Sequence, residues 1–162
     1  MSKREKLRRL LYIVQWLSFF SFVLLIAVFS MTGWIMEVPE GAEESAGNGF
    51  IGTYGMRPVL LMLFLAACTF DAVCLIFARF ARTFRYPVHV TSRNVEVQYL
   101  LSKMMLTLMQ IIGTLYCTFL MVQIYNMQMR LHSQAFAAVS LAAVALAGAD
   151  IAGYLYLARK NG

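Results

Sequence analysis

Long hydrophobic runs alternate with short polar stretches along this chain of 162 residues. Four of the runs reach or exceed the ~20 residues that a helix needs to cross the hydrocarbon core of a bilayer. They predict a single polytopic domain, 1–162, that is all-α and folds as an integral-membrane four-helix bundle. The expected spans are Leu10–Met36, Pro58–Ala78, Leu100–Tyr125 and Ala135–Ala158.

Composition supports a membrane protein over a soluble domain. Hydrophobic residues make up 60% of the chain, charged residues only 14%, and the mean hydropathy is +0.67. A soluble domain of this length would carry far more charge on its surface. The apolar runs are therefore interpreted as membrane spans and not as an ordinary core.

Basic residues are distributed unevenly and predict the orientation. Of the 14 Lys and Arg residues, five lie in 3–9, five in 79–103 and two at 159–160. Positive-inside bias then places both termini and the segment between the second and third spans in the cytoplasm. The net charge of +6 is explained by the anionic leaflet, so nucleic acid is not an expected partner. The acidic, glycine-rich segment 37–55 is interpreted as a solvated outer loop, because its spacing fits no calcium loop.

Two aspartates, Asp71 and Asp150, lie inside predicted spans, where a charged side chain is costly and usually faces the bundle or a water-filled cavity. Each is eight or nine residues from a basic flank, about 12–14 Å along a helix. Glutamines on the other two spans lie at similar depth, and Lys103 is a candidate partner for either aspartate. The predicted intramembrane polar layer consists of Gln15, Asp71, Lys103, Gln110 and Asp150. Two interpretations stay open: a proton pathway, or a static network that fixes helix register.

Small and polar residues recur at helical spacing around these side chains, which predicts that both aspartates point inward. The stripes are Ala67, Cys68, Asp71, Cys74 and Ala78 in the second span, Lys103, Thr107, Gln110, Thr114 and Cys117 in the third, and Ala143, Ala147, Asp150 and Gly153 in the fourth.

No catalytic or metal-binding motif appears. The two histidines, His89 and His132, are expected on opposite sides of the membrane, and the three cysteines fall inside spans with no C-x-x-C pair. We therefore expect no enzyme, no cofactor and no metal site. One alternative stays open, since the thioethers of Met127 and Met129 beside His132 would suit Cu(I), although methionine in a membrane protein is more typical of packing.

Within the polar segment 84–103, residues 84–99 are predicted to form an ordered cytoplasmic connector between the second and third spans. Pro87 favours an extended entry, Thr91 or Ser92 can cap a helix, and Glu96 falls in its first turn near the positive dipole end. The rings of Tyr86 and Tyr99 are expected to be buried. The exposed side is expected to present Arg85, His89, Arg93 and Gln98.

The stretch "YPVHVTSRNVEVQY" resembles a motif of a bacterial integral-membrane family of unknown function related to the SdpI-type immunity proteins. His89 and Val95 depart from the family pattern, and its outer His and Asn/Asp element is absent. The resemblance implies a small bacterial inner-membrane protein with no established chemistry. The matching residues are Tyr86, Pro87, Val88, Val90, Thr91, Asn94, Glu96, Gln98 and Tyr99.

Two classes of function follow from these observations. The first is a non-enzymatic binding protein, immunity-like or an accessory subunit that docks a partner. The second is a small proton- or ion-coupled transporter that uses Asp71 and Asp150. The expected surroundings are the lipid bilayer of the bacterial cytoplasmic membrane, and the candidate partners are another membrane protein or a second copy of the chain.

Overall fold

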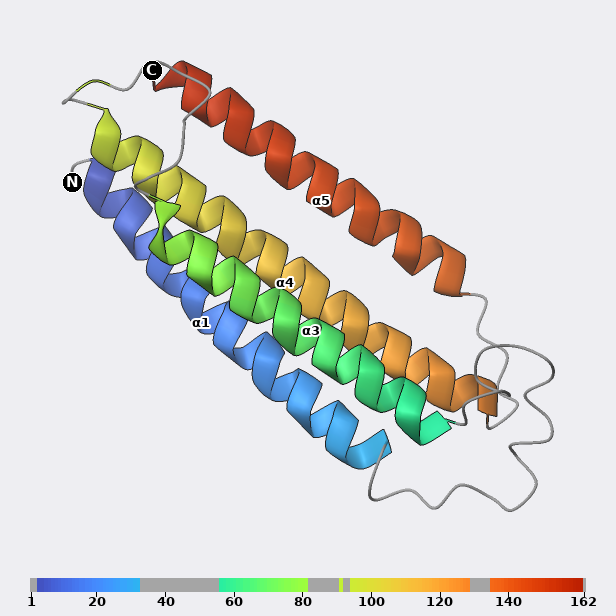
Figure 1. Cartoon of the computed structure of the whole chain (residues 1–162). Coiled ribbons are helices and arrows are strands. Elements are labelled where there is room, and N and C mark those ends of the chain that lie inside the picture. The colour runs from blue at the N-terminus through green and yellow to red at the C-terminus, as the bar shows by residue number, and fades with distance from the viewer. Residues whose placement is uncertain (1–2, 33–55, 82–90, 92–93, 129–134, 162) are drawn as a thin grey trace.

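The computed structural model describes residues 3–32, 56–81, 91, 94–128 and 135–161. These residues form four helices, each long and apolar enough to cross a membrane, which confirms the prediction of an all-helical multi-pass bundle. The helices are α1 (Lys3–Ser30), α3 (Met56–Arg79), α4 (Val95–Gln128) and α5 (Ala135–Lys160), as Figure 1 shows.

Two helix boundaries differ from the predicted spans because charged residues continue a helix beyond the hydrocarbon. α1 begins at Lys3 and ends at Ser30, so it takes in the basic N-terminal segment. α4 has 34 residues, about 51 Å of helix, and its start at Val95 precedes the apolar run. Asn94 directly precedes Val95, and Thr91, one of the two predicted capping residues, caps this helix. The Thr91 carbonyl accepts a bond from Val95 N at 3.0 Å, and the Asn94 side chain accepts a bond from Thr91 N at 2.7 Å, as in a capping box.

α4 is the central helix of the molecule. It packs extensively against α1 and α3 on one side and against α5 on another, whereas α1 and α3 touch each other little (Figure 1). The apolar core lies where α1 ends and α3 begins, around Leu25, Leu60, Ala67 and Met121. The stacked rings of Phe29 and Phe64, with centroids 4.3 Å apart, join α1 to α3 there. Toward the other end of the bundle α1 and α3 diverge.

Gly113 allows α3 to approach α4 closely. A β-carbon at this position would lie 2.4 Å from Cε1 and 2.8 Å from Cδ1 of the Phe70 ring. No side chain larger than hydrogen fits without moving that ring, which is the usual reason for a small residue at a contact between membrane helices.

Three hydrogen bonds join α4 to α5 in one antiparallel register. Gln98 donates to the Ala158 carbonyl at 2.9 Å, Ser102 donates to Tyr154 at 3.1 Å, and the hydroxyls of Tyr116 and Ser140 are 3.1 Å apart. Tyr116 is fourteen positions after Ser102, and Ser140 is fourteen positions before Tyr154, so the two bonds share one register. Most of α5 outside this contact is exposed, as expected of a helix that faces lipid.

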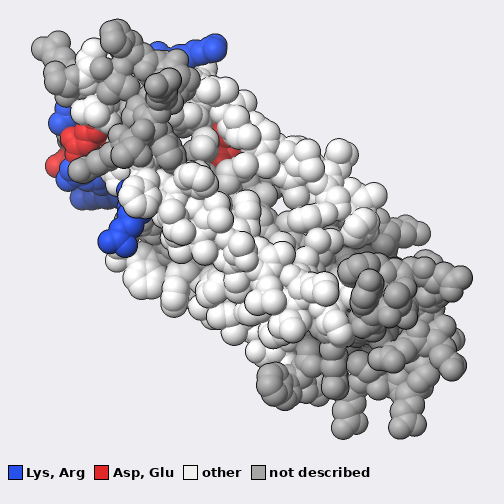
Figure 2. Space-filling view, viewed as in Figure 1, with Lys and Arg blue, Asp and Glu red and all other residues white. Residues whose placement is uncertain are grey.

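Charged side chains gather at the end of the bundle that holds the N-terminus of α1 and the C-terminus of α5, here called the basic end (Figures 1 and 2). Arg4 and Arg8 of α1 both form ion pairs with Glu96 of α4, the former at 3.0 Å. Both arginines are more than half exposed, so these pairs add modest stability but fix the neighbouring helix ends.

A polar cavity between three helices

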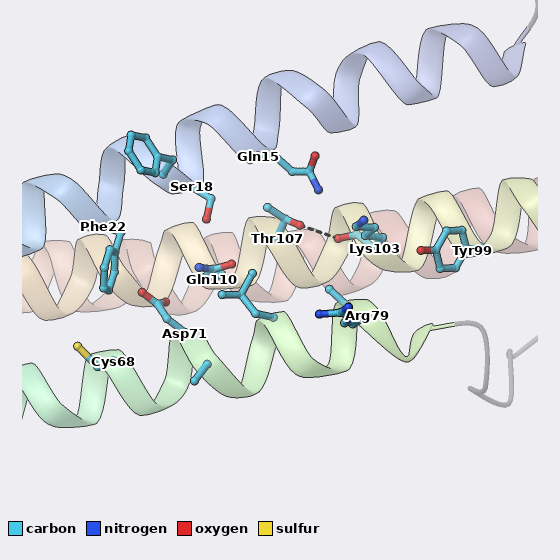
Figure 3. A pocket seen from close by; sticks show the side chains of 14 residues that line it. Gln15, Ser18, Phe22, Cys68, Asp71, Arg79, Tyr99, Lys103, Thr107 and Gln110 are labelled. Carbon is cyan, nitrogen blue, oxygen red and sulfur yellow. Dashed lines mark hydrogen bonds between the residues drawn. The ribbon is translucent and has the colours of Figure 1, made fainter.

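A cavity of about 670 Å³ opens where α1 and α3 diverge over α4. Its outer wall is apolar and includes Phe19 and Phe22 of α1 and Leu75 of α3. Its polar lining comes from all three helices: Gln15 and Ser18 of α1, Asp71 and Arg79 of α3, and Tyr99, Lys103, Thr107 and Gln110 of α4 (Figure 3).

Four of the five residues of the predicted polar layer line this polar cavity. They are Gln15, Asp71, Lys103 and Gln110. They lie at different heights: Asp71 is toward the middle of the bundle, whereas Lys103 and Arg79 lie toward the basic end (Figure 3). Asp71 and Arg79 are eight residues apart on α3, about 12 Å along the helix. The cavity therefore has an acidic inner end, toward the middle of the bundle, and a second end that is basic and coincides with the basic end of the bundle.

Asp71 is 3% exposed, and its Oδ1 lies 2.8 Å from the hydroxyl of Thr114 on α4. The same hydroxyl lies 2.8 Å from the Gln110 carbonyl. A hydroxyl has one proton to donate and can also accept. An ionised Asp71 thus receives the Thr114 proton, whereas a protonated Asp71 donates to Thr114 while Thr114 donates to Gln110. The geometry accommodates both protonation states without movement of the helices.

The other carboxylate oxygen of Asp71, Oδ2, is buried and has no hydrogen-bond partner among the described residues. Burial of an unpaired polar atom costs about 1–3 kcal/mol, so this oxygen lowers the stability of the protein when nothing in the cavity bonds to it. Lys103 does not relieve this cost, because neither Asp71 nor Asp150 forms an ion pair with it.

The remaining hydroxyls of the α4 stripe bond to their own helix. Thr107 donates to the Lys103 carbonyl and Thr118 to the Thr114 carbonyl, each at 2.8 Å. This back-bonding lets threonine lie in an apolar environment without a partner on another helix. Thr114 differs from these two because a second acceptor, Asp71, lies within reach.

Asp150 does not line the polar cavity. It faces α4 from α5, and the antiparallel register places it level with Leu106, four residues from the Ser102–Tyr154 pair on each helix. Its Oδ2 is also buried and has no hydrogen-bond partner in the described part of the chain. The two aspartates thus contact different sides of α4, and the structure does not bring them together in one layer.

The described residues of the connector motif link the start of α4 to its neighbours. Glu96 pairs with α1, and Tyr99 is half-buried and lines the polar cavity. Gln98 is fully buried against α5, so the prediction that it is exposed is wrong. Its side chain reaches the last carbonyls of α5, which sequence spacing alone does not reveal. The predicted positions of Tyr86, Pro87 and Val88 lie outside the described residues.

Sequence reasoning missed Arg79 and Ser18 as lining residues. Arg79 was used only to predict the orientation of the spans. Its position about two helical turns after Asp71 could have shown that both residues lie on the same face of α3. Ser18 left no signal beyond its small polar side chain. Within the described part of the chain, no group of three or more His, Cys, Asp or Glu side chains could hold a metal ion. Cys68, Cys74 and Cys117 are free thiols.

Fold and site together define a multi-pass helical membrane protein with a polar cavity between its helices. Comparison of the chain with family models, curated proteins and solved structures finds no match.

Proposed function

We propose that this chain is a non-enzymatic binding protein of the bacterial cytoplasmic membrane, of the immunity or accessory type, and that it holds its partner molecule in the polar cavity. The observation that carries the proposal is a cavity of about 670 Å³ with an acidic and a basic end. Small-molecule sites range over about 300–1,000 Å³ and combine apolar walls with a few polar groups. The bacterial setting rests on the family resemblance of residues 86–99.

The size of the cavity limits what it can hold. A helix with its side chains is about 10 Å across, so two turns fill roughly 850 Å³. A whole helix of a partner protein therefore does not fit in 670 Å³. A small amphiphilic molecule, or a side-chain group of a partner, fits better.

Photo-crosslinking inside cells tests the binding function. A benzophenone amino acid at Leu75, which lines the cavity, is expected to give an adduct of discrete mass. The matched control is Ile76, which is similarly exposed (56% against 58%) but is not a lining residue. Ala72→Phe, which fills the cavity, is expected to remove the adduct, whereas Val73→Phe, outside the lining, is not. The same broad mixture of products at Leu75 and Ile76 would contradict the proposal.

The proposal includes an orientation with both termini in the cytoplasm, supported by the basic end (Figure 2). Single cysteines at Ser45 and Ser133, in a background without native cysteines, are expected to react with an impermeant thiol reagent added outside. Cysteines at Ser2 and Ser92 are expected to react only after the membrane is opened. Labelling of a cysteine at Ser92 from outside would contradict either the proposed orientation or the four-span topology.

A second candidate function, proton-coupled transport, is favoured by one observation. The Thr114 hydroxyl can receive or supply the hydrogen bond to Asp71, so the site accepts a proton without rearrangement. This version of the transporter uses Asp71 alone, because Asp150 lies apart from the cavity.

A further inference from the structure

We propose that the polar cavity binds an anionic phospholipid, with the phosphate between Arg79 and Lys103 and one acyl chain along the apolar wall. The inference rests on the proposed binding function and names its ligand. It starts from the pair of cations at the basic end of the cavity, which come from different helices and both line it (Figure 3).

Arg79 and Lys103 are available to an anion. Among the described residues, neither forms an ion pair, in contrast to Arg4 and Arg8, which share Glu96. Arg79 is exposed and Lys103 half-buried, so the pair can be reached from the membrane surface. Basic pockets between membrane helices on the cytoplasmic side bind anionic head groups, because phosphate restores the partner that such cations lack.

From the basic end inward, the lining changes from two cations to neutral polar and apolar side chains, with Asp71 at the inner end. Beyond the two cations, the side-chain amide of Gln15 points into the cavity near Thr107 (Figure 3) and can donate to an ester oxygen. Phe19, Phe22 and Leu75 then form an apolar wall suited to a hydrocarbon chain. The gap between α1 and α3 gives such a chain lateral access from the bilayer.

Asp71 fixes the direction of the bound molecule. It lies at the inner end of the cavity, about 12 Å from Arg79 along α3, and offers no donor to a phosphate when ionised. When Asp71 is ionised, a head group placed there would meet like charge in an apolar setting, which is strongly unfavourable. The phosphate is therefore confined to the basic end, as in the cytoplasmic leaflet.

Lipid retention by the purified full-length protein in a neutral detergent tests the proposal by native mass spectrometry. We expect one phosphatidylglycerol per chain to be retained in preference to phosphatidylcholine. Arg79→Gln and Lys103→Gln are each expected to weaken retention about fivefold or more. Arg159→Gln and Lys160→Gln, at the same end but outside the cavity lining, are the matched controls and are expected to retain the lipid.

Ala72→Phe provides a second variant that keeps every charge but blocks the path of the acyl chain, and it is expected to lose phosphatidylglycerol. Circular dichroism checks that each variant is folded. Equal retention of the two lipids, or equal losses from all four basic substitutions, would overturn the proposal. Displacement of the lipid by millimolar glycerol phosphate would also overturn it, since it would show a site for a free anion. If the Leu75 adduct persists in any of these cases, the binding function stands and only the ligand is wrong.

Discussion

Replacing Gly113 by leucine is expected to destabilise the bundle by about 2–3 kcal/mol, measured as the free energy of unfolding when SDS is titrated into micelles. A β-carbon alone would lie 2.4 Å from the Phe70 ring, and leucine adds three more carbons in the same direction. The ring must leave its place or α3 must move away from α4. Because the polar cavity lies between these helices and α1, its shape would change as well.

Two further variants separate this contact from a general effect of leucine in a helix. Gly153→Leu is the matched control, because nothing lies within 4 Å of a β-carbon at Gly153. Phe70→Ala in the Gly113→Leu background is expected to restore part of the lost stability by giving space back. Equal costs at Gly113 and Gly153 would show that the close approach of α3 to α4 has no energetic weight.

Replacing Asp71 by leucine is expected to stabilise the protein by about 1–3 kcal/mol, since it removes a buried oxygen that has no partner. Thr114 is not left unpaired, because its hydroxyl still donates to the Gln110 carbonyl. The cavity beside Asp71 also has room for the larger side chain. A gain in stability would mark Asp71 as a residue kept for function, because functional groups often oppose stability.

A double-mutant cycle measures the interaction between Thr114 and Asp71. Thr114→Val is expected to cost about 1–3 kcal/mol in the native chain, where it removes the partner of Asp71 Oδ1, and much less in the Asp71→Leu chain. A loss of stability in Asp71→Leu itself would instead support a static network that fixes helix register. Proton uptake by liposomes that contain the protein, if abolished by Asp71→Asn while the fold persists, would favour transport over binding.

Different contacts hold the helices together at the two ends of the bundle. The apolar core around Leu25 and Met121, with the Phe29–Phe64 stack, holds α1 and α3 together at one end. At the basic end, Glu96 and its two arginines join α1 to α4. The polar cavity lies between these two attachments, so it can stay open while the helices remain fixed.

The number and approximate position of the membrane helices follow from the hydrophobic pattern of the chain, because about 20 consecutive apolar residues have few other stable environments. The same pattern also predicts which face of α4 is polar, since Thr107, Gln110 and Thr114 recur at helical spacing and are all buried. The positive charge at the basic end is also predicted from the sequence, because most Lys and Arg residues lie just beyond the ends of the spans.

Which helices contact one another became clear only from the folded chain. Lipid is as apolar as leucine, so hydrophobic pattern does not distinguish a face that contacts lipid from one that contacts a helix. Depth along the span suggested that Asp71 and Asp150 share a layer, yet α4 lies between α3 and α5 and separates them. Gln98 is polar and near a helix end, which predicts exposure, but α5 covers it. Counting residues from the basic flank gave only an approximate depth, because Asp71 contacts Thr114 whereas Asp150 is level with Leu106, eight residues away along α4. Both the final depth and the rotation about α4 depend on side-chain packing between helices that are distant in the chain.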